Sequence, residues 1–311
     1  MNILHACPAN VATGGTESIH NFIRTLDDIK GVDARIYYMG GAGQPCPHEY
    51  LEYGCRYVTD LPADYRGMII FPEIWANMAL DQRYKGCIRA VNWLGIDSYH
   101  WHSRADERGA FLGDKDIIHL VQSDYAEDFM EKLGITNVYR NVDVLNRAFY
   151  KDYEEGQRSN VVLYNPVKAT AFTEQLIREC GGIQFRPIKG LSRDQVIDLM
   201  RHSKLYIDFG NFPGRERIPR EAVMCGCCII IGNVGSGRYP GDFTIPTQYK
   251  YERNDAHTFA IRRMIGEVLA DYDGHRQDFD LFRDLLRDDR ELLKRQCREL
   301  VYEVQHNHSG A

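Results

Sequence analysis

Short apolar runs and amphipathic segments alternate along the first half of the chain. Runs rich in isoleucine, valine and aromatic residues predict buried strands at residues 1–7, 33–40, 67–73, 87–96 and 117–124. Between these runs, residues 17–26 carry apolar side chains at helical spacing, which predicts an amphipathic helix. Residues 125–134 predict another helix, because Ser123 and Asp124 can cap its start. Strands that alternate with helices in this way are typical of a parallel sheet.

The alternation stops at a polar stretch, residues 151–160, and then begins again. Strands are predicted at residues 161–166, 183–188, 205–210 and 228–232, with helices at 171–180, 192–203 and 219–226. From about residue 255 to residue 305 the pattern is strongly helical, and the many charged side chains there are expected to face solvent. The polar stretch is therefore interpreted as a linker between two domains.

The fold class predicted from this pattern is α/β, with two Rossmann-like domains at residues 1–152 and 153–311, the second ending in helices. A chain of 311 residues is long for one hydrophobic core, which also favours two domains. The two domains are expected to face each other across a cleft. Ligands of open parallel sheets bind at the carboxyl ends of the strands, so the residues just after each strand are the functional candidates.

Composition narrows the class of protein. The apolar fraction of 44% and the charged fraction of 26% are ordinary for a globular protein. The formal net charge of −6 argues against a general nucleic-acid binder. No stretch approaches the ~20 apolar residues needed to cross a bilayer, and no basic region precedes an apolar run at the N-terminus. Neither a membrane span nor a signal peptide is therefore expected.

Nine cysteines are spaced irregularly along the chain, and Cys225 and Cys228 form a C-x-x-C pair within an apolar passage. Because no second Cys or His pair lies near them in the sequence, we expect small buried thiols rather than zinc or redox chemistry. Cysteines without a disulfide framework fit a reducing cytoplasm.

Paired glycines follow the first predicted strand, in the segment "TGGTE". Gly14 and Gly15 let the backbone approach a ligand closely, and the N-terminus of the following helix offers amide groups to an anion. The alternative is a plain turn in which Glu17 interacts favourably with the helix dipole. The spacing is not G-x-G-x-x-G, so nicotinamide binding is not indicated.

Aromatic and polar residues cluster after the strand predicted at 87–96. Residues 92–102 include two tryptophans, a tyrosine, two histidines and Asp97. Aromatic faces flanked by hydrogen-bonding groups suit a sugar, whose faces are apolar and whose edges carry hydroxyls. His100 and His102 have no third ligand at a useful spacing, so no metal site is predicted. The alternative is an aromatic contact between the domains.

Basic residues follow two strands of the second half. Lys168 comes after the strand at 161–166 and can reach a phosphate, although it can also be an ordinary surface lysine. After the strand at 205–210, the passage "NFPGRERIPREAVMCG" places Arg215 and Arg217 where a loop becomes a helix. This passage is either a solvated ion-pair network or the wall of a site for an anionic ligand.

Taken together, these loops resemble those of two-domain glycosyltransferases of the GT-B fold. The resemblance extends over about residues 1–250 and rests on "TGGTE", "QSDYAEDFMEKLGI", Lys168 and "PREAVMCG". The last segment matches a Pro-x-Glu-Ala-x-x-x-Gly helix start that faces the donor, and it is the most specific of the four. The passage is most similar to that of bacterial proteins linked to surface polysaccharides.

The resemblance implies a nucleoside-diphosphate sugar as donor and a glycan or lipid-linked glycan as acceptor. Glu221 would bind the ribose, while Lys168 and Arg217 would neutralise the departing diphosphate without a metal ion. The implied donor-binding residues are Gly14, Gly15, Thr16, Tyr164, Asn165, Lys168, Arg215, Arg217, Ile218, Pro219 and Glu221. No cofactor is expected beyond this substrate.

The acceptor side is implied by the loops of the first half. The implied acceptor-binding residues are Glu17, Trp93, Tyr99 and His100. A reaction that inverts configuration needs a general base, for which Asp97 is the first candidate, followed by Glu73, Glu17 and His100. Asp97, Glu73, Lys168 and Arg217 are thus the expected catalytic residues.

Two features depart from the commonest retaining branch of these enzymes, in which two glutamates are separated by seven residues. Counting back from Glu221 leads to Pro213, and Glu216 is out of register. The arginine usually found beside the lysine is also displaced, and Arg215 or Arg217 is the candidate to replace it. Whether transfer retains or inverts configuration therefore stays open.

Two other functions stay open as well. A sugar-nucleotide 2-epimerase can use the same fold, and so can a non-catalytic protein that binds nucleotides or carbohydrates, because a fold does not establish activity. The expected location is the cytoplasm, with peripheral association at the inner face of the membrane if the acceptor is lipid-linked. No nucleic-acid partner is expected, and the sequence leaves the oligomeric state open.

Overall fold

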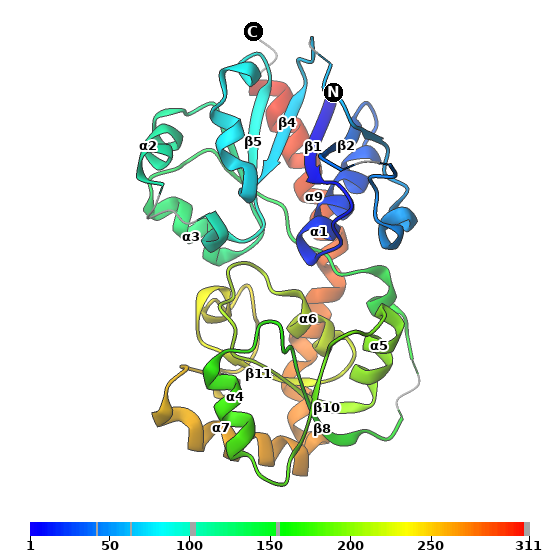
Figure 1. Ribbon diagram of the computed structural model, residues 1–311, viewed down its shortest axis with the longest axis vertical. Helices are drawn as coiled ribbons and strands as arrows, with labels where there is room; N and C mark the ends of the chain where they lie inside the picture. Colours follow the sequence, from blue (N-terminus) through cyan, green and yellow to red (C-terminus); the bar gives the residue numbers. More distant parts are fainter. Residues whose placement is uncertain (42, 63, 100–103, 154–155, 308–311) are drawn as a thin grey trace. The chain divides into compact units, whose positions relative to one another are not determined.

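The computed structural model describes residues 1–41, 43–62, 64–99, 104–153 and 156–307 (Figure 1). The chain divides into two compact units: unit 1 comprises Met1–Val144 and Asp289–Ala311, and unit 2 comprises Leu145–Asp288. Each unit contains one sheet of parallel strands connected by helices and loops. The prediction of two Rossmann-like α/β halves is confirmed.

Unit 1 is built on a parallel sheet whose described strands follow the order β3-β2-β1-β4-β5-β6-β7. The strands are β1 (Asn2–Pro8), β2 (Asp33–Met39), β3 (Tyr57–Val58), β4 (Met68–Pro72), β5 (Ile88–Trp93), β6 (Ile118–Val121) and β7 (Val138–Arg140). The helices are α1 (Gly14–Asp27), α2 (Ala105–Gly113) and α3 (Asp124–Lys132), with the 3-10 turns η2 (Glu73–Leu80) and η4 (Ile96–Tyr99) after β4 and β5. As predicted, the Ser123 hydroxyl caps α3 by accepting from the Ala126 amide.

Unit 2 is built on a second parallel sheet with the order β12-β11-β10-β8-β9 among the described strands. The strands are β8 (Ser159–Tyr164), β9 (Gln184–Pro187), β10 (Ser203–Asp208), β11 (Cys228–Gly232) and β12 (Lys250–Tyr251). The helices are α4 (Ala171–Glu179), α5 (Arg193–Arg201), α6 (Arg217–Met224), α7 (Asp255–Ala270), α8 (Tyr272–Arg276) and α9 (Asp280–Asn307). The short strands β3, β7 and β12 were not predicted, because two or three residues carry no usable alternation.

The order of strands reverses once in each sheet. In unit 1, β1 pairs with β2 on one side and with β4 on the other; in unit 2, β8 pairs with β9 and with β10. Connections that leave two neighbouring strands in opposite directions open a crevice at their carboxyl ends, which is where ligands of such sheets bind. The best candidates for a ligand-binding site are therefore the loops after β1 and β4 in unit 1 and the loops after β8 and β10 in unit 2.

The core of unit 2 explains the cysteine-rich passage. All five residues of β11 are buried, as expected for a parallel strand with elements on both faces. Cys225, Cys227 and Cys228 are also buried and carry free thiols, and burial raises the pKa of Cys227 to about 12. These residues are the small buried thiols that the sequence predicted.

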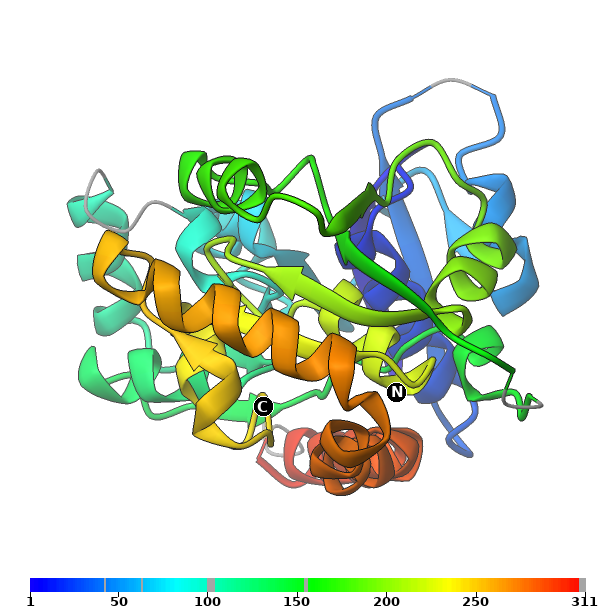
Figure 2. The ribbon, with the colours of Figure 1, turned by 90° about the horizontal axis from the view of Figure 1, so that it is seen from below.

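The long helix α9 contributes to both units. Its first part places Phe282 and Leu286 in the core of unit 2, whereas Leu300 and Val304 are buried in the part that belongs to unit 1. It is one helix from Asp280 to Asn307, drawn in orange to red in Figure 1 and seen along its axis in Figure 2. The chain therefore divides differently from the expected 1–152 and 153–311, because a continuous helix with two apolar stretches can serve two cores.

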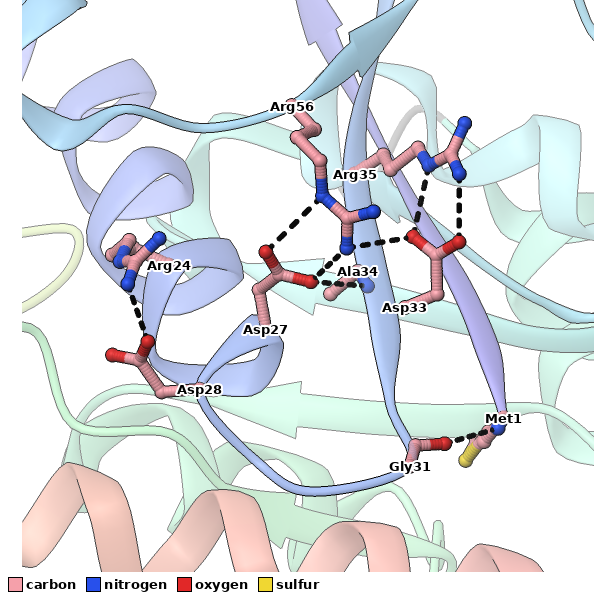
Figure 3. Close-up of polar contacts among 9 residues, drawn as sticks. All are labelled: Met1, Arg24, Asp27, Asp28, Gly31, Asp33, Ala34, Arg35 and Arg56. Atoms are coloured by element: carbon pink, nitrogen blue, oxygen red, sulfur yellow. Dashed lines mark hydrogen bonds and ion pairs between the residues drawn. The ribbon is translucent and has the colours of Figure 1, made fainter.

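A polar network holds the edge of unit 1 opposite to the carboxyl ends of its strands (Figure 3). Arg56 pairs with Asp27 at the end of α1 and with Asp33 at the start of β2, the latter at 3.0 Å. Arg35 binds Asp33 through two nitrogens, and Asp27 accepts from the Ala34 amide at 3.1 Å. Half-exposed pairs of this kind contribute little stability, but they fix how α1 returns into β2.

No helix among the described residues is long and apolar enough to span a bilayer.

Truncation of α9 tests its double role. Leu286→Ala and Leu300→Ala should each lower the free energy of unfolding by about 2–5 kcal/mol, because both side chains are fully buried. Leu285→Ala is the matched control: its side chain is 42% exposed, so the change should stay within about 0.5 kcal/mol. Urea unfolding followed by circular dichroism measures all three. Loss of stability in only one of the two buried variants would contradict a helix shared by two cores.

Candidate functional site

A pocket of about 370 Å³ lies among the loops that follow β8 and β10 in unit 2. Its position is the point at which the order of strands reverses. The residues that line it are Val167, Lys168, Ala169, Thr170, Asp208, Gly210, Asn211, Phe212, Pro213 and Glu216. The pocket thus includes Lys168, which the sequence singled out, Glu216, which is out of register with the paired-glutamate pattern, and Asp208, which was not predicted.

Lys168 lies in the loop between β8 and α4. The loop begins after the half-buried Tyr164, and the Asn165 side chain accepts a hydrogen bond from the Val167 amide at 3.0 Å, which turns the chain. A Cβ atom built on Gly210 would lie 3.6 Å from Lys168 Cβ and 3.0 Å from Asp208 Oδ1. The loops after β8 and β10 therefore meet at Lys168, where glycine allows them to pack closely.

The ammonium group of Lys168 pairs with the carboxylate of Glu216. The Lys168 side chain is 44% exposed, whereas that of Glu216 is 11% exposed. Glu216 is the N-cap residue of α6, so this ion pair connects the loop after β8 to the start of the helix after β10. A cation at a helix N-terminus in a polar pocket is an arrangement that can bind an anion.

Asp208 is among the residues that line the pocket, and it is buried. Its carboxylate accepts hydrogen bonds from the Tyr206 hydroxyl at 2.7 Å and from the Gly210 amide at 2.8 Å. Burial raises the pKa of Asp208 from its ordinary 3.8 to about 6, against the opposing effect of these two hydrogen bonds. The nearby carboxylate of Glu216 raises this pKa further, and the ammonium of Lys168 lowers it.

The loop after β10 has a strained backbone that neighbouring groups hold in place. Phe212 is buried with a φ of 51°, a left-handed conformation that a non-glycine residue seldom adopts. The Ser236 amide donates to the Phe212 carbonyl at 3.0 Å, and the Ser236 hydroxyl donates to the Gly214 carbonyl. Gly235, with a φ of 52°, leaves room for this approach, since a Cβ there would lie 2.2 Å from the Phe212 oxygen.

Two arginines bind the same loop through its carbonyl groups. Arg220 is fully buried and donates to the carbonyls of Arg215 at 2.7 Å and Glu216 at 3.0 Å. Arg253 donates to the Asn211 side chain at 2.8 Å and to the Phe209 carbonyl at 3.2 Å. Such a set of contacts over-determines a loop, as is common where the shape of a binding site matters.

The remaining candidates of unit 2 lie in or just before α6, outside the lining of the pocket. Arg217 begins the helix, and its Nε lies 3.9 Å from Oε1 of Glu221, one turn later. Both side chains are largely covered, at 10% and 14% exposed. Arg215 and Pro219 are buried, and Ile218 packs against the core of unit 2.

In unit 1, the paired glycines open α1 as the sequence predicted. Neither Gly14 nor Gly15 has a left-handed φ, and a Cβ on Gly15 would make only an ordinary contact of 3.4 Å with Leu94. The backbone conformation therefore does not require glycine here. Thr13 is the N-cap residue, and the Thr16 hydroxyl accepts from the Thr13 amide at 2.9 Å. This buried hydroxyl completes a capping box, and the donor contact expected of Thr16 stays a prediction.

Glu73 lies at the carboxyl end of β4, where it begins η2. It is 7% exposed, and its carboxylate accepts from the Leu94 amide at 3.3 Å. Burial raises the pKa of Glu73 to about 7, and hydrogen bonds from backbone amides oppose this shift. A carboxyl group with such a pKa can exchange a proton near neutral pH.

The other acidic candidates of unit 1 have different surroundings. Asp97 is exposed on η4 and accepts a hydrogen bond from the Tyr125 hydroxyl at 2.8 Å. Glu17 is 7% exposed and accepts a hydrogen bond from the Tyr53 hydroxyl at 2.6 Å. Glu17 is as deeply buried as Glu73, and the acceptor role expected for it stays a prediction.

The expected aromatic surface is corrected. Trp93 is 1% exposed and Tyr99 is 3% exposed, and both pack in the core of unit 1 against Phe111. The Trp93 indole donates to Nδ1 of His119 at 3.0 Å. Neither aromatic face is available to a sugar. His100, the third acceptor residue predicted there, lies outside the described residues.

Within the described parts of the chain, no group of three or more His, Cys, Asp or Glu side chains is placed to hold a metal ion.

Reasoning from the sequence missed several residues that shape the pocket. Asp208 could have been found, because a carboxylate that ends an apolar strand lies at the carboxyl edge of a parallel sheet. The contacts of Ser236 and Arg253 with the loop after β10 bring together segments far apart in the chain, and no local pattern indicates them. The left-handed Phe212 likewise has no sequence signal.

No protein-family model matches the chain, and no curated protein matches it by sequence. Solved structures are similar over nearly its whole length. HepE from Anabaena, solved in complex with UDP-glucose, is 11% identical with a TM-score of 0.73, covering 97% of this chain and 100% of its own. Sucrose-phosphate synthase from Thermosynechococcus elongatus is 12% identical with a TM-score of 0.69, covering 99% of this chain and 100% of its own.

A third similar structure belongs to another class of enzyme. The UDP-GlcNAc 2-epimerase from Neisseria meningitidis, bound to UDP-GlcNAc, is 10% identical with a TM-score of 0.55, covering 98% of this chain and 100% of its own. Identities this low establish the fold alone, and that fold is GT-B. The fold is common to proteins of more than one activity, so function must be argued from the site.

The buried carboxyl of Asp208 predicts a pH dependence of stability. Its folded-state pKa is raised to about 6, so at pH 5 the folded state holds a proton that the unfolded state lacks. Its contribution to stability is present at low pH and is lost as pH rises through about 6. Between pH 7 and pH 5, wild type should gain about 1 kcal/mol over Asp208→Asn, which cannot titrate. Urea unfolding at pH 5, 6 and 7 measures this, and a constant difference would contradict a raised pKa.

Proposed function

We propose that this chain is a glycosyltransferase that moves a sugar from a nucleoside-diphosphate donor to a glycan or lipid-linked acceptor. One observation carries the proposal: Lys168 and the N-terminal end of α6 meet in one pocket, where the order of strands reverses in the sheet of unit 2. A diphosphate needs a cation and backbone amides at the carboxyl edge of such a sheet, and this pocket offers both.

The similar structures support a uridine nucleotide as the first donor to test. HepE was solved with UDP-glucose and the Neisseria epimerase with UDP-GlcNAc, each on a fold shared with this chain. In this proposal Lys168 and Arg217 neutralise the diphosphate as it leaves, so that transfer proceeds without a metal ion. Glu221, close to Arg217 on α6, binds the ribose hydroxyls, and Tyr164, Asn165, Arg215, Ile218 and Pro219 shape the surroundings of the donor.

Unit 1 contributes amides and a proton acceptor in this proposal. The backbone at Gly14 and Gly15 presents the N-terminus of α1 to an anion without a side chain in the way. Glu73 takes precedence over Asp97 as the candidate base, because a pKa of about 7 suits proton transfer at neutral pH. A lipid-linked acceptor, as in the synthesis of bacterial surface polysaccharides, would bring the enzyme to the inner face of the membrane.

A sugar-nucleotide 2-epimerase is the second candidate, favoured by the likeness to the Neisseria enzyme over 98% of this chain. The two activities leave different products from one UDP-sugar. Transfer or hydrolysis releases UDP, whereas epimerisation leaves the nucleotide sugar intact with an altered sugar. Chromatography of the nucleotide products separates them.

Thermal shift tests the donor site directly. UDP, GDP, dTDP, CMP and ADP are added to wild type, Lys168→Ala and Glu221→Ala, and we expect one nucleoside diphosphate to stabilise wild type alone. A ligand at ~100 times its dissociation constant stabilises the folded state by ~2.7 kcal/mol, which is a readable shift in melting temperature.

Lys132→Ala is the matched control, because it removes an exposed lysine from unit 1, with 70% of its side chain in solvent. This variant should respond to the nucleotide as wild type does. If no nucleotide stabilises wild type, or if Lys168→Ala and Glu221→Ala respond fully, then the pocket of unit 2 is not the donor site.

A further inference from the structure

The pocket of unit 2 contains an acidic side chain, Glu216, beside the cation expected to bind phosphate. The carboxylate of Glu216 pairs with the ammonium of Lys168, and both residues line the pocket. Only 11% of the Glu216 side chain is exposed, so this carboxylate is placed inside the site rather than in bulk solvent. Lys168 is the cation that the proposed function assigns to the diphosphate.

Glu216 does not act as an ordinary helix cap. It occupies the N-cap position of α6, but within the described residues its side chain accepts no capping hydrogen bond from that helix. Serine, threonine, aspartate and asparagine are the residues preferred for that role. The carboxylate instead pairs with the Lys168 ammonium, at the positive end of the helix dipole. A phosphate would be attracted by the same two features.

Charge does not allow the carboxylate and a diphosphate to share Lys168 favourably. The buried carboxyl of Asp208 also lies close to this lysine. One ammonium group therefore already interacts electrostatically with two carboxyl groups. A diphosphate adds several negative charges in the same small volume. Like charges at contact distance repel strongly where water is partly excluded. The carboxylate and the diphosphate are therefore expected to compete for the lysine.

Hydrogen bonds hold the backbone at the start of α6, whereas the Lys168 side chain is partly exposed. Arg220 donates to the carbonyls of Arg215 and Glu216 at 2.7 and 3.0 Å, which fixes the main chain at the start of α6. Lys168 is 44% exposed, so its ammonium can be reached from solvent. Release of the lysine therefore requires the two side chains to separate and does not require the main chain at the start of α6 to move.

We propose that Glu216 sets the affinity of the site for diphosphates: its carboxylate pairs with Lys168 when no nucleotide is bound, and the donor displaces it from the lysine. This inference rests on the proposed function, because it takes the diphosphate to bind at Lys168. The carboxylate returns to the lysine when the nucleotide leaves. Glu216 therefore weakens the binding of the diphosphate and speeds its release.

The test is a set of dissociation constants for UDP and uridine, measured by isothermal titration calorimetry. Glu216→Gln should bind UDP about five- to tenfold more tightly than wild type, since it removes a competing pair and a like charge. Uridine, which has no phosphate, should bind both proteins equally. In Lys168→Ala, adding Glu216→Gln should change the affinity for UDP less than in the wild-type background, because the pair is already absent.

Two controls separate this role from a general effect of charge. Glu216→Asp keeps the negative charge and should show a smaller gain than Glu216→Gln. Glu174→Gln removes an exposed carboxylate from the first turn of α4, the helix that follows the Lys168 loop, and should change the affinity less than twofold. The melting temperature of each variant without nucleotide verifies that it is folded.

The outcomes separate this inference from the proposed function. If wild type binds UDP and Glu216→Gln binds it equally or more weakly, then Glu216 is not a competitor, although the donor site stands. If the gain of Glu216→Gln is as large in Lys168→Ala as in wild type, the lysine is not what the carboxylate holds. If neither wild type nor Glu216→Gln binds any nucleoside diphosphate, the proposed donor site fails and this inference fails with it.

Discussion

The reversal of strand order in each parallel sheet is the constraint on which the candidate site depends. In unit 2, β8 has β9 on one side and β10 on the other, so the connections that follow β8 and β10 separate at their carboxyl ends. The pocket with Lys168 and Glu216 lies there, and in unit 1 Glu73 and the start of α1 occupy the equivalent place between β1 and β4. The order of the strands alone therefore places these loops at the crevice where ligands of such sheets bind.

Holding such a pocket open requires a loop that cannot collapse into it. The loop after β10 is fixed through its carbonyl groups by Ser236, Arg220 and Arg253, and it includes the left-handed Phe212. These contacts compensate for a conformation that costs about 1–3 kcal/mol in isolation. A rigid frame allows the few movable charges inside it, above all the ion pair of Lys168 and Glu216, to respond to a ligand while the fold stays unchanged.

The sequence predicted what depends on local pattern. The buried strand β11 and the capped start of α3 could both be predicted, because an apolar run and a capping residue are local features of the sequence. Whether an aromatic side chain faces the core or the solvent depends on residues far away in the sequence. The prediction that Trp93 lies on an exposed surface was therefore wrong. The Lys168–Glu216 pair joins residues 48 positions apart, and only the sheet topology brings them together.

A crystal structure of the protein with UDP tests the central claim most directly. If the pocket of unit 2 binds the donor, the diphosphate should lie at the N-terminal end of α6, with one of its oxygens within hydrogen-bonding distance of Lys168 Nζ. The Glu216 carboxylate should no longer contact Lys168. A nucleotide bound elsewhere on the chain, or a diphosphate in the pocket beside an intact Lys168–Glu216 pair, would contradict it.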